Sequence, residues 1–275
     1  MSQPKQRHEI ATKPVVYGIP GMDAVTVRQN VVYQAPDSGA LTMDIYYPPD
    51  AKSGARMPAV VFALGLSDLG AEAMFGCKFK EGESYIGWAR LAAASGLVAI
   101  TYTNRAPTAD LQELLRYVRQ NAAQLGIDEN RIGVWSCSAH GPVTLSVLMQ
   151  HEFAKDLKCA ALCYPYTLDL EGSTGIAEIF RQWGIGDPNA GKTVRDLPRD
   201  LPLFVARAGR DETPRLNEAL DRFLSHALAC NLPLTLANHP TGPHAFDVLQ
   251  DSEASREIIR QILAFLRFHL LTNGR

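Results

Sequence analysis

The chain has 275 residues, of which 46% are hydrophobic and 20% charged, which is enough for one large α/β domain with a full core. Its formal net charge of −2 provides no basic field for nucleic acid or for an anionic membrane. We therefore expect a small-molecule or peptide partner, with no nucleic acid and no membrane among its partners, and a homodimer stays open.

The opening residues 1–8 lack the apolar segment of a signal peptide, and no later stretch reaches the ~20 apolar residues of a membrane span, so we expect a cytoplasmic protein. The five cysteines are scattered without a C-x-x-C spacing, which argues against a disulfide framework and against a structural zinc site. We expect no metal and no organic cofactor.

The first half of the chain alternates between strand and helix patterns. Residues 1–24 are polar and rich in turn residues, so we expect a loosely held N-terminal arm, or a lid-like extension over the body, before a single domain at 25–275. Two alternating apolar runs around a Pro/Asp/Gly turn predict an antiparallel hairpin within 25–47. The next predicted elements are a buried strand at 58–64, a functional loop at 65–83, a helix at 84–94, a strand at 97–102 and a helix at 110–125.

The second half continues the alternation. Its predicted elements are strands at 159–164, 203–208 and 232–237, a helix at 216–229 and an amphipathic terminal helix at 254–271. Residues 166–200 are too long for a simple connection and indicate a cap-like insertion. Together these patterns predict an α/β fold, a doubly wound and mostly parallel sheet with helices on both faces and active groups at the carboxyl ends of its strands.

The segment from Arg131 to Gly141 reads as a strand, a sharp turn and a helix, with Ser138 at the apex of the turn. Such a turn exposes a nucleophilic serine only if the residues two before and two after it are small. Ser138 has the small Ser136 at minus two, whereas a nucleophile at Cys137 would have a tryptophan there. His140 stands at plus two, where glycine is usual. An ordinary strand-to-helix turn with two incidental serines is the alternative.

A serine nucleophile needs a base to take its proton and an anion to orient that base. Asp211 follows the strand at 203–208, and His244 lies in the loop after the strand at 232–237. The chain order Ser138, Asp211, His244 is that of the α/β hydrolases. Each residue also has an ordinary structural interpretation, the aspartate as a helix cap and the histidine as packing. His239 competes for the role of base, but it lies against the strand end and before a proline.

These residues resemble the α/β-hydrolase superfamily, and within it the dienelactone-hydrolase-like and small carboxylesterase members. The resemblance covers about residues 25–271 and rests on four segments: Leu41–Tyr47 with Asp44, the turn at 131–141, Ala208-Gly-Arg-Asp211, and Gly242-Pro-His244-Ala-Phe-Asp247. It implies a serine esterase in which Ser138 attacks the ester, His244 carries the proton and Asp211 orients His244.

The same resemblance implies an oxyanion hole made by the backbone N–H groups of Ala139 and Leu66. The loop that supplies Leu66 reads Leu64-Gly65-Leu66 in place of the family's His-Gly-Gly. A non-catalytic ligand-binding relative and a small serine peptidase stay open as alternatives to the esterase.

Several bulky side chains near these segments indicate an apolar surface for substrate, with core packing as the alternative for each. They are Met74, Phe75, Trp183 and Phe246. We expect His140 to have a structural or substrate-contact role and not to act as the base, because the helix directs it along the sheet and away from the nucleophile.

Overall fold

The computed structural model describes residues 7–35, 39–52, 54–170, 175–182 and 186–272 of the chain. Its strands form one eight-stranded sheet in the order β1-β2-β4-β3-β5-β6-β7-β8. Only β2 runs antiparallel to its neighbours, and the remaining pairs are parallel. The predicted α/β class, with a doubly wound, mostly parallel sheet and an antiparallel N-terminal hairpin, is confirmed. The strands are β1 Thr26–Gln34, β2 Leu41–Tyr47, β3 Met57–Phe62, β4 Val98–Tyr102, β5 Ile127–Cys137, β6 Leu157–Cys163, β7 Leu203–Ala208 and β8 Leu234–His239.

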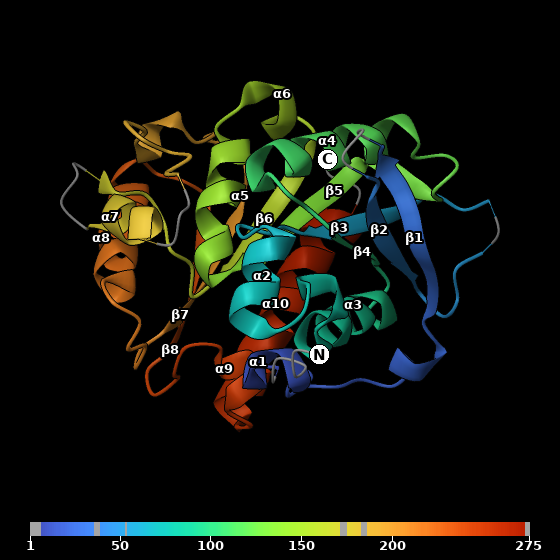
Figure 1. The fold of residues 1–275 in the computed structure, drawn as a ribbon, viewed down its shortest axis with the longest axis horizontal. Coiled ribbons are helices and arrows are strands. Elements are labelled where there is room, and N and C mark those ends of the chain that lie inside the picture. Colours follow the sequence, from blue (N-terminus) through green and yellow to red (C-terminus); the bar gives the residue numbers. More distant parts are fainter. Residues whose placement is uncertain (1–6, 36–38, 53, 171–174, 183–185, 273–275) are drawn as a thin grey trace, which may run out of the picture.

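Helices cover both faces of the sheet (Figure 1). Helices α3 and α10 contact the strands on one face, and α4 and α5 pack against each other on the other face. The described α-helices are α1 Glu9–Thr12, α2 Asp68–Phe75, α3 Glu83–Ala94, α4 Pro107–Gln120, α5 Gly141–Leu148, α6 His151–Ala154, α7 Ile176–Gln182, α8 Leu216–Ala229, α9 Phe246–Leu249 and α10 Glu253–Leu271. Among these residues, no helix combines the length and the apolar character that a membrane crossing needs.

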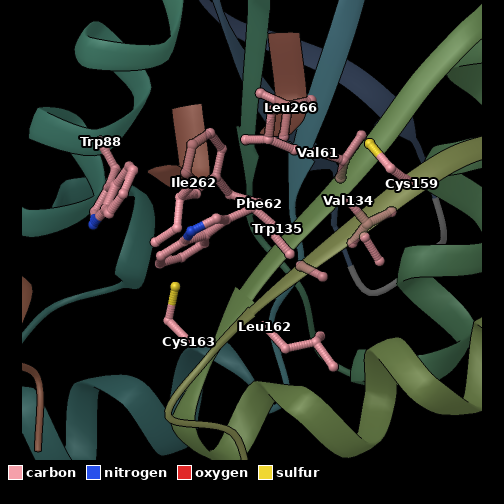
Figure 2. Close-up of a cluster of buried hydrophobic side chains, with 14 of the residues drawn as sticks. Val61, Phe62, Trp88, Val134, Trp135, Cys159, Leu162, Cys163, Ile262 and Leu266 are labelled. Atoms are coloured by element: carbon pink, nitrogen blue, oxygen red, sulfur yellow. The ribbon is translucent and has the colours of Figure 1, made fainter. Parts of the chain in front are cut away.

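The core on the α3 and α10 face is aromatic. Phe62 of β3 is directly opposite Trp135 of β5 in the strand register, and their ring centroids lie 5.0 Å apart. Trp88 of α3 packs on Trp135 at 5.1 Å. Figure 2 shows these three rings together with Ile262 of α10, whereas Leu162 of β6 points to the opposite side of its strand. This packing fixes the position of β5, the strand that ends directly before Ser138.

The described part of the predicted arm, residues 7–24, is packed against the body of the domain. Val15 is buried in the main core, and the backbone N–H of Val16 donates to the carbonyl of Asp247 at 2.8 Å. The His8 ring lies edge-on to Phe75 of α2, with centroids 5.6 Å apart. The alternative of a loosely held arm is therefore wrong for these residues, because apolar side chains among the polar ones provide a surface to bury. The alternative of a lid-like extension over the body stays a prediction.

The loop expected at 65–83 contains helix α2 and a 3-10 turn at Phe79–Glu81. Ser67 begins α2 by accepting a hydrogen bond from the N–H of Gly70, and Gly76 ends it at φ 78°. The described parts of the 166–200 insertion pack against α8, where Ile176 and Phe180 form a small apolar cluster with Leu216. Strand β8 is shifted by two residues from its predicted range and includes His239.

Candidate active site

Ser138 lies at the turn between β5 and α5, with a backbone φ of 50°. A left-handed conformation costs a residue other than glycine of order 1–3 kcal/mol, and surrounding contacts must maintain it. One such contact is the hydrogen bond from the N–H of Tyr166 to the Ser138 carbonyl, at 3.0 Å. Ser138 itself is half-buried. The geometry is that of a strained turn which presents a serine at the end of a strand.

Two glycines make the tight packing around this turn sterically feasible. A Cβ on Gly65 would lie 2.2 Å from the carbonyl oxygen of Ala139, and a Cβ on Gly141 would lie 2.2 Å from the carbonyl oxygen of Tyr166. The usual glycine at plus two allows close packing around the turn. Here Gly141, at plus three, and Gly65, in the facing loop, allow it instead. This arrangement explains how the turn accommodates His140.

Asp211 and His244 form a hydrogen-bonded pair. His244 Nδ1 lies 2.7 Å from Asp211 Oδ2, and the other carboxylate oxygen accepts the N–H of Thr213 at 2.9 Å. Burial alone raises the pKa of Asp211, but the hydrogen bonds and charge of His244, together with the bonds from Thr213, outweigh it and lower the pKa overall. Asp211 is therefore an anion that orients His244, whose Nε2 is left for a second partner.

Three buried side chains, Tyr164, Asp247 and Trp88, form a hydrogen-bonded group that packs against His244 through the Tyr164 ring. Tyr164 follows β6, and its ring lies edge-on to the His244 ring with centroids 4.9 Å apart. The Tyr164 hydroxyl donates to Asp247 at 2.6 Å, and Trp88 Nε1 donates to the other oxygen of Asp247 at 2.6 Å. Asp247, three residues after His244, is thus bonded to Trp88 of α3 and to Tyr164 at the end of β6. These bonds restrict the loop that carries His244.

Ser138, Asp211 and His244 follow the carboxyl ends of β5, β7 and β8, which run parallel and end at the same edge of the sheet. Tyr164 contacts His244, and Tyr166, two residues later, bonds to Ser138. Within the described part of the chain, no hydrogen bond joins Ser138 Oγ to the His244 ring. Such bonds are often long before substrate binds.

The alternative base, His239, and the alternative nucleophile, Cys137, are both in environments that do not favour catalysis. His239 is buried and its Nε2 lies 3.1 Å from Ser255 Oγ in α10. Burial raises the pKa of the Cys137 thiol to about 12, so Cys137 stays protonated and is a poor nucleophile. Over the described ranges, no three His, Cys, Asp or Glu side chains gather as a metal ion would require.

The loop with the expected oxyanion donor is bonded to its surroundings on several sides. The N–H of Leu64 donates to the Tyr102 hydroxyl at 3.1 Å, and Asn104 Nδ2 donates to the Leu66 carbonyl at 3.1 Å. The N–H groups of Leu66 and Ala139 have no acceptor among the described residues.

His140 is 3% exposed, and its Nδ1 accepts the N–H of Gly65 at 2.6 Å. Its ring is edge-on to Phe79, with centroids 4.6 Å apart. Burial lowers its pKa to about 3, so the imidazole is neutral and carries its proton on Nε2. This contact between turn and loop was not expected from the sequence, where His140 is 75 residues away from Gly65.

The side chains proposed to contact substrate are dispersed. Phe246 is fully buried beside the Tyr164 ring, which is the core position kept open as its alternative. Phe75 packs between His8 and Phe79, whereas Met74 is 49% exposed on α2. Trp183 lies outside the described residues.

No family model matches the chain, and no curated protein matches it. Solved structures do. A thermophilic esterase of Thermogutta terrifontis, Est2, shares 22% identity over 93% of this chain and 97% of its own, with a TM-score of 0.69. The same esterase phosphorylated by paraoxon matches at 22% identity and a TM-score of 0.65, over 94% of this chain and 98% of its own. An esterase of the fungus Rhizomucor miehei matches at 15% identity and a TM-score of 0.67, over 91% and 85% of the two chains.

The chain has the α/β-hydrolase fold. The likeness extends over nearly all of each esterase chain, and in this fold the carboxyl edge of the parallel strands is where catalytic groups gather. Ser138, Asp211 and His244 follow that edge here. At these identities the likeness establishes the fold, and the chemistry depends on the site itself.

Proposed function

We propose that the protein is a serine hydrolase of carboxylic esters. The observation that carries the proposal is the hydrogen-bonded pair of Asp211 and His244 at the sheet edge where Ser138 occupies a strained turn. A strained backbone persists only when other contacts enforce it, and such strain is concentrated at functional sites. The esterase neighbours, one of them phosphorylated by paraoxon, support the same reaction class.

In the proposed reaction, Ser138 Oγ bonds to the carbonyl carbon of the ester while its proton passes to His244 Nε2. The oxyanion that forms accepts hydrogen bonds from the N–H groups of Leu66 and Ala139. When the intermediate collapses, the bond to the alcohol oxygen breaks and the alcohol takes the proton from His244. Water then attacks the acyl-enzyme with His244 as base, which releases the acid and restores Ser138.

Turnover of p-nitrophenyl butyrate tests the proposal. The wild-type protein should hydrolyse the ester, and Ser138→Ala should lower kcat by several orders of magnitude, of order 10⁶-fold in other serine hydrolases. Ser136→Ala is the matched control: Ser136 is two residues away and fully buried, and its hydroxyl has no partner within the described chain. Its kcat should equal that of wild type.

Paraoxon provides a second readout that depends on bond formation. Attack by Ser138 Oγ on phosphorus releases p-nitrophenolate and leaves a diethylphosphoryl group on the peptide that contains residue 138. The wild type and Ser136→Ala should be labelled once, and Ser138→Ala should not be labelled. A wild-type protein that neither hydrolyses any ester nor takes the label would instead be a non-catalytic binder.

A further inference from the structure

The loop at residues 64–68 touches the nucleophile turn directly. A Cβ on Gly65 would lie 2.7 Å from the Cα of His140 and 2.2 Å from the carbonyl oxygen of Ala139, so the two backbones are in van der Waals contact. At this contact the N–H of Gly65 donates to His140 Nδ1 at 2.6 Å. The loop and the turn are therefore joined next to both N–H groups assigned to the oxyanion.

His140 is held firmly on its own side of this contact. Its ring is nearly perpendicular to the rings of Phe79 and Tyr85, with centroid distances of 4.6 Å and 6.1 Å. Its backbone carbonyl accepts the hydroxyl of Thr144, one turn later in α5. A buried ring enclosed by aromatic neighbours has few alternative rotamers, so its Nδ1 offers the loop an acceptor at a fixed position.

Glycine, the usual residue at this position, has no side chain to accept the Gly65 N–H. That N–H would be buried without an acceptor, and the loop would have to move or admit water. A displaced loop carries the N–H of Leu66 with it, because Leu66 follows Gly65 directly. Oxyanion stabilisation depends on donors placed within hydrogen-bond distance of the developing charge, so a small displacement lowers the rate.

We propose that His140 is a positioning residue that holds the Gly65–Leu66 loop against the turn, so that the N–H groups of Leu66 and Ala139 bind the same oxyanion. The proposal rests on the esterase function above. His140 acts through Gly65 and touches neither the nucleophile nor the substrate.

Two substitutions separate the acceptor from the volume. His140→Asn retains an acceptor, Oδ1, at the same number of bonds from the backbone as Nδ1, whereas His140→Leu fills the space without an acceptor. His140→Leu should lower kcat by about 10- to 100-fold with KM changed by less than about twofold, because the lost interaction forms only in the transition state. His140→Asn should recover kcat to within about threefold of wild type.

Phenylboronic acid, which forms a tetrahedral adduct on a serine nucleophile, tests the transition-state assignment. Its inhibition constant should rise in His140→Leu by about the same factor by which kcat falls. Ser136→Ala is the matched control, because it removes a buried hydroxyl near the same turn that has no partner within the described chain. Its kcat and inhibition constant should stay close to wild type.

Amide hydrogen exchange at Gly65 provides a readout that does not depend on activity. Exchange there should accelerate at least about tenfold in His140→Leu and stay unchanged in Ser136→Ala. Unchanged Gly65 exchange, or unchanged kcat and boronate affinity in a folded His140→Leu protein, overturns the positioning role alone. A wild-type protein without ester turnover overturns the esterase proposal and the positioning role with it.

Discussion

Two adjacent carboxylates, Asp211 and Glu212, are candidates for the partner of His244, and the contacts favour Asp211. Its side chain has no exposed surface and lies 2.7 Å from His244, whereas the next residue, Glu212, is exposed. Asp211→Asn would present an amide N–H or a neutral oxygen to Nδ1 and disturb the tautomer of His244. We expect kcat on p-nitrophenyl butyrate to fall about 10³- to 10⁴-fold, with Glu212→Gln close to wild type. Equal losses from both substitutions would mean that the wrong carboxylate is assigned.

His140 also predicts a pH dependence of stability. Its pKa is lowered by burial to about 3 in the folded protein, against about 6.5 in an unfolded chain. Between these values only the unfolded chain takes up the proton, so this contribution to stability is complete above about pH 6.5 and is lost as the pH falls. At pH 5 the loss relative to neutral pH amounts to ~2 kcal/mol.

Urea unfolding at pH 7.5 and pH 5 measures this contribution. The wild type should lose ~2 kcal/mol more than His140→Asn between the two pH values, because the other histidines are common to both proteins. An equal loss in the two proteins would show that the imidazole is protonated in the folded state.

The catalytic candidates were accessible to sequence reasoning, whereas the role of His140 was not. Ser138, Asp211 and His244 each follow a predicted strand, so chain order and the sheet-edge rule were enough to group them. The acceptor of the Gly65 N–H, by contrast, depends on which way one buried ring turns in three dimensions. The only signal in the sequence was the coincidence of an unusual histidine in the turn with a missing histidine in the loop.

At the scale of elements, a buried ion pair connects the 3-10 turn at Phe79–Glu81 to the hairpin. Lys80 Nζ lies 2.9 Å from Asp44 Oδ1 in β2 and donates to Asn30 Oδ1 at 2.8 Å. Removing one partner of a buried pair leaves the other charge uncompensated. We expect Lys80→Met to lower the free energy of unfolding by about 3–5 kcal/mol, measured by urea denaturation.

Neutralising the partner provides the control for this substitution. In the wild type the N–H of Asn30 donates to Asp44 Oδ1 at 2.8 Å. In a Lys80→Met, Asp44→Asn double variant the charge is gone, while the amide oxygen of residue 44 can still accept this N–H. Stability should recover by more than about 1 kcal/mol relative to Lys80→Met alone. A double variant that is less stable than the single one would show that the cost comes from packing.

Element boundaries were predicted well where apolar spacing determines them and poorly elsewhere. Strand β7 and helix α8 have the predicted ranges, because each has a regular apolar pattern between clear turn residues. Helix α4 begins at Pro107 and ends at Gln120, five residues before its predicted end. Helix α2 was missed, because its short, glycine-containing sequence has weak periodicity and depends on its end residues, Ser67 and Gly76.

At the scale of the whole molecule, contacts from distant parts of the chain meet beneath the candidate site. The N-terminal residues 7–16 touch α2, α3 and the Asp247 backbone, and the same aspartate bonds to Tyr164, whose ring supports His244. Phe75 and Phe79 extend this packing from His8 to His140. The N-terminal segment is therefore part of the structure that supports both histidines.

Limited proteolysis tests whether this segment is held in place. Chymotrypsin cleavage after Tyr17 requires the segment to detach, so in the wild type it should be slow. Val15→Asp places a charge in a site where the wild-type side chain is only 7% exposed, and cleavage should accelerate at least about tenfold because the docked state is destabilised.

Val32→Asp is the matched control, since Val32 is 44% exposed, and it should be cleaved as slowly as wild type. Cleavage after Tyr102 in the buried strand β4 identifies global unfolding, which would raise both rates together. Rapid cleavage after Tyr17 in all three proteins would mean that the segment detaches freely in solution.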